Sequence, residues 1–534
     1  MKRSFKALTQ TQYDVVIVGG GVYGACIAEK LGRSGYKAAL IEASDFGAAT
    51  SSNSLGILHG GLRYLQHFNL KRMRRSIKSR HYFMRLAPQI IDITAFNYPL
   101  KGWSINGPLA MRIALTLNDF ISRRRNENLP SNIHIPKSYV RSSDASQWFS
   151  ETPKLNGVGV WHEAVVRHLE RLVLEITQSA SQQGVDIANY CKAERLIMHK
   201  DELTGIRIKD RLSGQRSTLS CRWVIDASGH NIGRLHAGTK KLSKTQTWAR
   251  AVNAIIEGRI IGDEAIALTV PDTVQDTLHD SKKHLQNTRS LFFVPQHKQT
   301  LVGTFYDHQN NLKKGLALSE KEKIRFLKDI NQCHPRLNIR LDEVSHWQSG
   351  WLPLEAQNNA NDHHALELKS ESQLNKHLYQ GQHTTGVIEV KGVKFTTAPA
   401  VAEDVHTLLA EHIAKQSQAK KQTSNQTPPN RELEKQLYTR YGQNWHRVKA
   451  LLLQDKNHLT PLHEQLRQGE IYYMCQHEMA LRLSDIMLRR LTFKLEATEA
   501  ITLATKISLV MQTIYHWSDA RREREIEHFT ATLG

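Results

Sequence analysis

The stretch VVIVGGGVYGACIAEKLGRSGYKAALIEASDF (residues 15–46) decides the fold of this chain. It begins with a continuous apolar run, typical of a buried strand, and passes through a glycine-rich turn into a helical pattern that ends at Gly35. A second apolar run follows and ends at Glu42. The order of strand, glycine turn, helix, strand and acid predicts a Rossmann-type unit that binds the pyrophosphate of a dinucleotide.

Three glycines of the turn have the spacing Gly-x-Gly-x-x-Gly, and we expect each to have a different role. Gly19 would allow the tight turn, Gly21 would let the backbone approach the pyrophosphate, and Gly24 would let the helix pack closely on the strand. Glu42 lies where a carboxylate accepts hydrogen bonds from ribose hydroxyls. These features alone do not separate NAD from FAD.

The segment after Glu42 favours FAD. A two-domain NAD enzyme normally continues with further βα units, whereas this chain enters a run of small and hydroxyl residues, AATSSNSLGILHGG (48–61). Such a run suits a backbone that lies along an extended cofactor. We expect Thr50, Ser51 and Ser52 to bind the diphosphate or the edge of the ring system, and an ordinary loop is the alternative.

The whole chain is long and basic. It has 534 residues, and 72 Lys and Arg against 51 Asp and Glu give a net charge of +21. The length predicts more than one domain, and the charge predicts an anionic partner such as a membrane surface or an acidic substrate. Nucleic acid is not expected, because the sequence has no helix-turn-helix, finger or aromatic RNA motif. The 5 cysteines form no Cys-x-x-Cys pair, and we predict neither disulfides nor a metal site.

Two segments bear on membrane contact. Segment 107–121 is apolar but contains Arg112, Asn118 and Asp119, so we do not expect it to span a bilayer. The helix predicted over 69–86 carries many basic residues and no acid. Its charges are either a solvated face over a packed stripe or a contact with anionic lipid.

These motifs resemble those of the FAD-dependent glycerol-3-phosphate dehydrogenases, in the D-amino-acid-oxidase-like flavoprotein superfamily. The resemblance covers nearly the whole chain, and its segments are VIVGGGVYGACIA, TSSNSLGILHGGLRYL, VIDASGHNIGRL, VGTFYDH, VKGVKFTTAPAVAED and HEMALRLSDIMLRR. It implies hydride transfer from a secondary alcohol carbon to flavin N5, giving the ketone, with electrons passed to quinone. It also implies a cytoplasmic enzyme, peripheral on the cytoplasmic face of the membrane, and leaves a homodimer open.

The resemblance also assigns site residues. Arg63 would bind the substrate phosphate, Lys394 would stabilise charge at the flavin, and His59 would lie near the flavin, with Lys394 and His59 as candidate bases. A structural arginine, a solvated lysine and a structural histidine are the alternatives. Thr396 and Thr397 would open the following helix as N-caps. The cofactor-binding residues would be Gly19, Gly21, Gly24, Glu42, Thr50, Ser51, Ser52, Gly60, Gly61, Ala227, Gly229, Gly392, Lys394 and Thr396.

Three positions depart from the family pattern, all on the substrate side. Leu352 stands in place of an arginine, Gly56 in place of a lysine, and Pro399 in place of an arginine. Replacing an arginine by leucine in a phosphate pocket removes a charge-assisted hydrogen bond of about 1.5–3 kcal/mol. Three hypotheses therefore stay open: glycerol 3-phosphate with compensating cations, a related dehydrogenase or oxidase of another hydroxy or amino substrate, and a catalytically decayed flavin-binding partner protein.

The expected fold class is α/β with α+β. A Rossmann-type FAD-binding domain would be joined to an antiparallel-sheet substrate domain and a C-terminal helical domain. The expected bounds are 11–95, 155–240 and 385–413 for the FAD-binding domain, 96–154 and 241–384 for the substrate domain, 414–432 for a linker, and 433–534 for the helical domain. Residues 356–384 are polar and are expected to form a loop.

Overall fold

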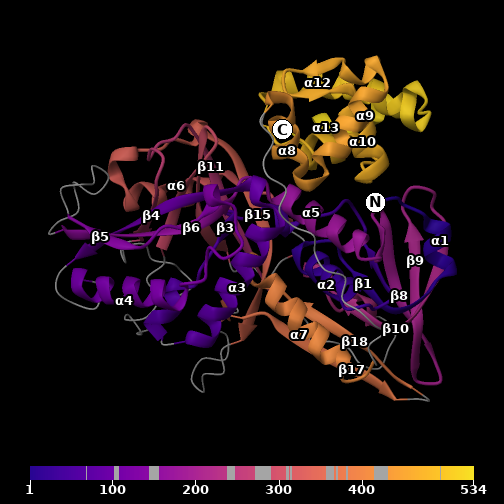
Figure 1. Cartoon of the computed structure of the whole chain (residues 1–534), viewed down its shortest axis with the longest axis horizontal. Coiled ribbons are helices and arrows are strands. Elements are labelled where there is room, and N and C mark those ends of the chain that lie inside the picture. Colours follow the sequence, from indigo (N-terminus) through magenta and orange to yellow (C-terminus); the bar gives the residue numbers. More distant parts are fainter. Residues whose placement is uncertain are drawn as a thin grey trace.

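A computed structural model describes most of the chain, which forms two large sheets and a C-terminal helical unit (Figure 1). The described residues are 1–67, 69–101, 107–142, 155–236, 247–270, 290–307, 312, 315–356, 366–368, 371–380, 383–413, 431–493 and 495–533. The side chain of Arg63 is outside this description, as are residues 414–430 of the expected linker.

The first sheet has a parallel centre made of strands that the sequence predicts to be buried. Its central strand β1 (Gln12–Val18) lies between β2 (Ala38–Ile41) and β10 (Arg216–Asp226), and β18 (Thr384–Lys391) pairs with β10. The remaining strands are β7 (Asp186–Ala188), β8 (Cys191–His199), β9 (Glu202–Asp210) and β17 (Gln373–Gln380). Both faces of the parallel centre are covered, which explains why these strands are almost continuously apolar.

Helices cover one face of this sheet, and an antiparallel hairpin covers the other. Val15 and Ile17 of β1 are buried in a core shared with three helices, α2 (Val22–Arg33), α5 (Leu169–Gln182) and α7 (Ala398–Ala410). Val16 and Val18 face the opposite way, toward β8, β9 and α1 (Phe5–Gln10). The βαβ unit predicted from residues 15–46 is therefore present.

The second sheet is mainly antiparallel. Its order is β16-β15-β11-β14-β13-β12-β4-β6-β3, with β5 paired to β6, and α6 (Glu320–Cys333) packs on it. The strands are β3 (Ile57–Leu58), β4 (Ile91–Lys101), β5 (Tyr139–Arg141), β6 (Leu155–Val166), β11 (Trp248–Glu257), β12 (Ala265–Thr269), β13 (Ser290–Gln296), β14 (Gln299–Asp307), β15 (Val344–Ala356) and β16 (Leu366–Leu368).

Two strands join a different sheet from the one that the expected domain bounds suggest. β6 begins the expected segment 155–240 of the FAD-binding domain, but it pairs along its length with β4 of the second sheet. β17 lies in segment 356–384, which we expected to be a loop of the substrate domain, but it pairs with β18 of the first sheet. β17 is polar because it is the edge strand of its sheet, so its sequence lacks the apolar signal of a central strand.

The C-terminal residues form a helical unit with its own core, as the sequence predicts. In Figure 1 the unit lies above α5 and close to the N-terminus. Its elements are α8 (Glu432–Tyr441), α9 (Trp445–Gln454), α10 (Gln468–His477), α11 (Leu483–Arg489), α12 (Ala497–Tyr515), α13 (Asp519–Thr530) and the hairpin of β19 (Pro461–His463) with β20 (Leu466–Arg467).

Two further helices lie away from this unit (Figure 1): α3 (Leu70–Leu86) and α4 (Pro108–Ile121). α3 begins after Asn69, whose side chain accepts a hydrogen bond from the backbone N–H of Arg72. Within the described part of the chain, no helix combines the length and the apolar character needed to cross a bilayer.

Candidate cofactor and substrate site

A cavity of about 1070 Å³ opens at the carboxyl ends of β1 and β2 and reaches the second sheet. This is the edge at which parallel α/β sheets bind their ligands. The first sheet and its loops contribute the predicted residues Gly19, Gly21, Glu42, Thr50, Ser51, Ala227, Gly229 and Gly392 to its wall. The second sheet contributes Trp248, Asn253, Thr304, Tyr306, Trp351 and Leu352. Its volume is at the upper end of the range for small-molecule sites, as a cofactor with a substrate requires.

The glycine turn has a backbone that other residues would not fit. Gly19 has φ +107°, and a Cβ on it would lie 2.5 Å from the carbonyl oxygen of Ala227. A Cβ on Gly24 would lie 1.8 Å from the carbonyl oxygen of Gly19. The turn therefore brings three backbone segments together at the N-terminus of α2, which is a site for an anion.

Glu42 is held in the cavity wall by backbone N–H groups. Its Oε2 accepts a hydrogen bond of 2.6 Å from Gly20, and its Oε1 accepts one of 2.7 Å from Ser44. Burial raises the pKa of Glu42, while these two N–H groups act in the opposite direction. The carboxylate is thus fixed at the end of β2, where it can accept hydrogen bonds from a ribose.

The three hydroxyl residues after this strand have different partners. Ser51 Oγ accepts a hydrogen bond of 2.9 Å from the N–H of Val22 in the first turn of α2, which leaves the hydroxyl hydrogen for an anion at that terminus. Thr50 Oγ1 accepts one of 3.1 Å from the N–H of Trp351 and so joins the two sheets. Ser52 donates to the carbonyl of Gly47 and holds the loop itself.

Tyr23, which the sequence analysis did not select, organises the turn before α7. Its hydroxyl accepts hydrogen bonds of 3.0 Å from the N–H groups of Val393 and Lys394 and lies 2.7 Å from the carbonyl of Lys394. A Cβ on Gly392 would lie 2.2 Å from the Tyr23 ring. The only sequence signal for this role is an aromatic residue beside the third glycine of the motif.

The two threonines of this turn do not cap α7 with their side chains, contrary to our expectation. Thr397 Oγ1 instead donates to the carbonyl of Lys394 at 2.9 Å. Thr396 is buried, and its hydroxyl donates to the carbonyl of Ile57 and accepts from the N–H of His59, both at 3.3 Å. These contacts join the turn to the loop that follows β3.

The candidate catalytic residues come from two loops. Lys394 Nζ donates a hydrogen bond of 2.9 Å to the hydroxyl of Tyr64, which joins the turn before α7 to the segment that contains Arg63. The His59 side chain is 48% exposed, and its Nδ1 lies 4.0 Å from Glu163 Oε1. Lys394 and the segment of Arg63 are therefore adjacent, and His59 is held next to them.

A buried ion pair supports the double glycine. The N–H of Gly60 donates a hydrogen bond of 2.8 Å to Glu163, which also pairs with Arg80 of α3. A Cβ on Gly60 would lie 2.5 Å from Arg80 Nη1, and Gly61 has φ +90°. Burial raises the pKa of Glu163, while the Arg80 charge lowers it. No sequence pattern points to either member of this pair, because they are far apart in the chain.

The three departures from the family pattern have different structural settings. Leu352 lies in the cavity wall with Trp248, so this part of the wall is apolar. Gly56 has φ +71°, and a Cβ there would lie 2.7 Å from the carbonyl oxygen of Val166, so the backbone itself requires glycine. Pro399 occupies the first turn of α7, where proline is favourable.

Family profiles match almost the whole chain. A profile described as "FAD dependent oxidoreductase" matches residues 14–406, and one described as "C-terminal domain of alpha-glycerophosphate oxidase" matches residues 402–522. The chain therefore belongs to the FAD-dependent oxidoreductase family. The glycine turn, the fixed Glu42 and the large cavity fit FAD, which is the cofactor of this family.

Named relatives narrow the class. The "Glycerol-3-phosphate dehydrogenase" of Synechocystis sp. is 26% identical over 416 residues, which are 76% of this chain and 71% of that protein. The "Aerobic glycerol-3-phosphate dehydrogenase" of Staphylococcus aureus is 24% identical over 417 residues, which are 77% of this chain and 69% of that protein.

A solved structure shares the fold over the whole chain. The glycerol-3-phosphate dehydrogenase of Bacillus halodurans, complexed with FAD, superposes with a TM-score of 0.68 at 18% identity, over 99% of this chain and 95% of that one. The chain is thus an FAD-dependent oxidoreductase of the glycerol-3-phosphate dehydrogenase and oxidase type, with a helical C-terminal domain.

Proposed function

We propose that this chain oxidises glycerol 3-phosphate, or a closely related secondary alcohol, to the ketone. The observation that carries the proposal is the single cavity whose wall contains both the fixed Glu42 and Trp351 and Leu352 of the second sheet. The names of the relatives support the substrate. When bound, FAD would supply the acceptor for the hydride, which carries both electrons of the oxidation.

The charge of the chain's own residues and the family resemblance support the following roles. Arg63 and Lys394 provide cations for an anionic substrate and for charge that develops during the reaction. The hydrogen bond from Lys394 to Tyr64 holds that cation against the segment of Arg63. His59, whose backbone N–H bonds Thr396 and whose ring lies near Glu163, and Lys394 are the two candidates that take the hydroxyl proton.

Because the cavity wall at Leu352 is apolar, two alternative functions should be tested together with the main proposal. A substrate without phosphate, such as another hydroxy acid or an amine, would not need a cation at this position. A protein that binds FAD but has lost catalysis would not need one either. The neighbouring Arg250 does not compensate, because it is buried and paired with Asp307 at 2.7 Å.

Anaerobic reduction of the bound flavin distinguishes these alternatives. Glycerol 3-phosphate should bleach the visible flavin band, whereas reduction only by unphosphorylated hydroxy acids or amines would identify a changed substrate. A yellow protein that no member of the panel reduces would refute the enzyme proposal. Leu352→Arg should lower the KM for glycerol 3-phosphate about tenfold or more, from one charge-assisted hydrogen bond. Leu453→Arg, on an exposed part of α9, is the matched control for added charge.

We also propose that the enzyme works on the cytoplasmic face of a membrane, with quinone as the electron acceptor. Support comes from α4, where Leu109, Ile113 and Phe120 are 67%, 62% and 65% exposed and share one side of the helix. Arg123 and Arg124 follow directly and are also exposed. An exposed apolar stripe beside arginines is typical of a helix that lies in an anionic membrane interface.

A second copy of the chain is a poorer occupant for this face, because two copies with a net charge of +21 would repel each other. Binding to anionic lipid vesicles tests the lipid assignment. Ile113→Ser with Phe120→Ser should weaken binding at least tenfold, while Ile501→Ser on the C-terminal α12 should not. If the double variant binds the vesicles as tightly as Ile501→Ser does, the membrane contact is not on α4. Faster reoxidation of the reduced enzyme by a quinone analogue than by oxygen would support the acceptor.

A further inference from the structure

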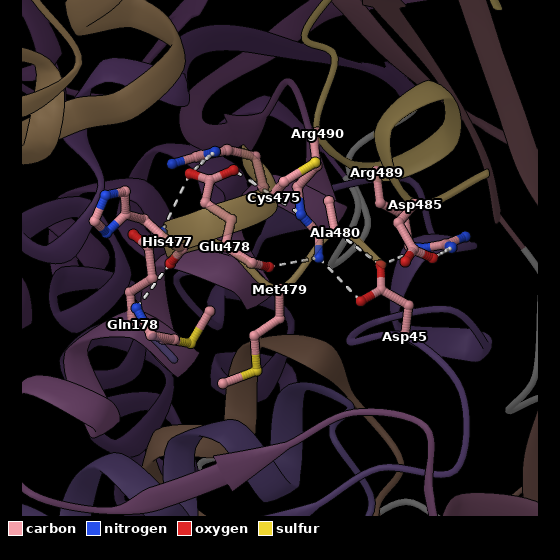
Figure 2. Close-up of polar contacts among 12 residues, drawn as sticks. Asp45, Gln178, Cys475, His477, Glu478, Met479, Ala480, Asp485, Arg489 and Arg490 are labelled. Carbon is pink, nitrogen blue, oxygen red and sulfur yellow. Dashed lines mark hydrogen bonds and ion pairs between the residues drawn. The ribbon is translucent and has the colours of Figure 1, made fainter. Parts of the chain in front are cut away.

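The C-terminal helical unit reaches the back of the cofactor cavity through buried ion pairs (Figure 2). Asp45 is fully buried and lies three residues after Glu42 in the chain. Arg490 bonds both of its carboxylate oxygens, at 2.7 and 2.9 Å, and Arg489 Nε bonds one of them at 2.6 Å. An aspartate of the first domain is thus held by two arginines of another domain.

The two arginines are themselves fixed within the C-terminal unit. Arg489 Nη2 also donates to Asp485 at 2.7 Å, and Arg490 Nη2 also donates to the carbonyl of Glu478 at 2.9 Å. Asp485 in turn accepts a hydrogen bond of 2.5 Å from the hydroxyl of Tyr190 in the first domain. Because the guanidinium fork is rigid and planar, this arrangement fixes the direction as well as the distance of the Asp45 side chain.

The loop that carries Asp45 has two sides. Ala43, Ser44 and Gly47 line the cavity, next to Glu42. Asp45 lies on the other side, where Asn189 donates to it at 3.0 Å. One side of this loop therefore lines the cavity beside Glu42, and the other side packs against the C-terminal unit through Asp45.

Stability alone gives a weak reason for such a cluster. Removing several charges from water costs free energy that their pairing does not always recover, and an apolar contact of similar size often stabilises as much. What the pairs provide is a defined geometry.

We propose that Arg489 and Arg490 are positioning residues for the adenosine half of FAD, which act through Asp45 on the loop beside Glu42. The C-terminal domain then completes the cofactor site without touching the cofactor. This proposal does not depend on the substrate, since it concerns only the binding of FAD.

A second contact between the same domains provides a matched control. Gln178 of α5 donates to Glu478 at 3.2 Å and accepts a hydrogen bond of 3.0 Å from Asn444, and both partners belong to the C-terminal unit. Figure 2 shows Gln178 on the opposite side of Glu478 from Asp45. Gln178→Ala therefore weakens the docking of the domain without removing a partner of the loop.

The test measures FAD release from the full-length holoenzyme, by the rise of free-flavin fluorescence after dilution, and ADP binding to the apoenzyme by calorimetry. Arg489→Gln should increase the Kd for FAD at least tenfold and weaken ADP binding in parallel. Arg489→Lys keeps the positive charge but can donate to only one of Asp45 and Asp485, so its Kd for FAD should lie between those of the wild type and Arg489→Gln. Gln178→Ala should stay within twofold of the wild type.

Thermal unfolding separates positioning from general destabilisation. If Arg489→Gln and Gln178→Ala lower the unfolding midpoint equally but only the former weakens FAD and ADP, the proposal stands. If both variants shift the two affinities in proportion to the midpoint, or if neither does, it is overturned. Asp45→Asn repeats the test from the loop side if Arg489→Gln does not fold.

Discussion

Replacing Tyr23 with phenylalanine removes one hydroxyl that holds the turn before α7. That hydroxyl accepts hydrogen bonds of 3.0 Å from the N–H groups of Val393 and Lys394. Val393 keeps a second acceptor, Ser372 Oγ at 3.2 Å, and Lys394 lies close to solvent. Neither N–H becomes a buried unsatisfied group, so the loss should be about 1–3 kcal/mol, the net contribution of two hydrogen bonds.

The assays are thermal unfolding of the holoenzyme and the rate of FAD release. Tyr23→Phe should lower the unfolding midpoint by a few degrees and speed FAD release, because the turn forms part of the cavity wall. Tyr36→Phe is the matched control, since the Tyr36 hydroxyl is buried without a hydrogen-bond partner among the described residues. Equal effects of the two substitutions would refute the reasoning, and so would an unchanged rate of FAD release in Tyr23→Phe.

Three other substitutions test further parts of the site. Gly24→Ala should abolish FAD binding while circular dichroism stays near that of the wild type, because its Cβ would lie 1.8 Å from a backbone oxygen. Burial alone would raise the pKa of Asp45, but the charges of Arg490 and Arg489 lower this pKa from 3.8 to about 2. The stability that the ionised Asp45 contributes is therefore present above pH ~4 and is lost as the pH falls toward 2. A pH jump into that range should accelerate FAD release in the wild type more than in Asp45→Asn. Glu163→Gln leaves a buried guanidinium unpaired and should cost about 3–5 kcal/mol in denaturant unfolding.

Local sequence was sufficient for the part of the site that consists of backbone. The glycine turn and Glu42 are close in the chain, and their spacing alone specifies a strand, a tight turn and a helix terminus. Fold class was equally accessible, because the parallel strands are apolar runs and the C-terminal segment has helical periodicity. FAD could be inferred only by adding the small-residue segment and the family resemblance.

The supporting side chains were not accessible in the same way. Arg80 and Glu163, which hold the double glycine, are on a helix and a strand that the sequence places far apart, and neither belongs to a motif. At Gly56 the sequence suggests a functional change that the structure explains by backbone geometry. It looks like a lost lysine, but its φ of +71° and the carbonyl of Val166 require glycine at that position.

The coupling between the C-terminal domain and FAD has a consequence that follows from thermodynamics alone. If the contact of Asp45 with Arg489 and Arg490 strengthens FAD binding, then bound FAD must strengthen the docking of the domain by the same free energy. Removal of FAD should therefore expose the interface around Asp45 to hydrogen exchange, and Arg489→Gln should reduce the difference in exchange between holo- and apoenzyme. A domain that docked independently of the loop would show the same exchange with and without FAD, because a ligand changes only those equilibria whose states it binds unequally.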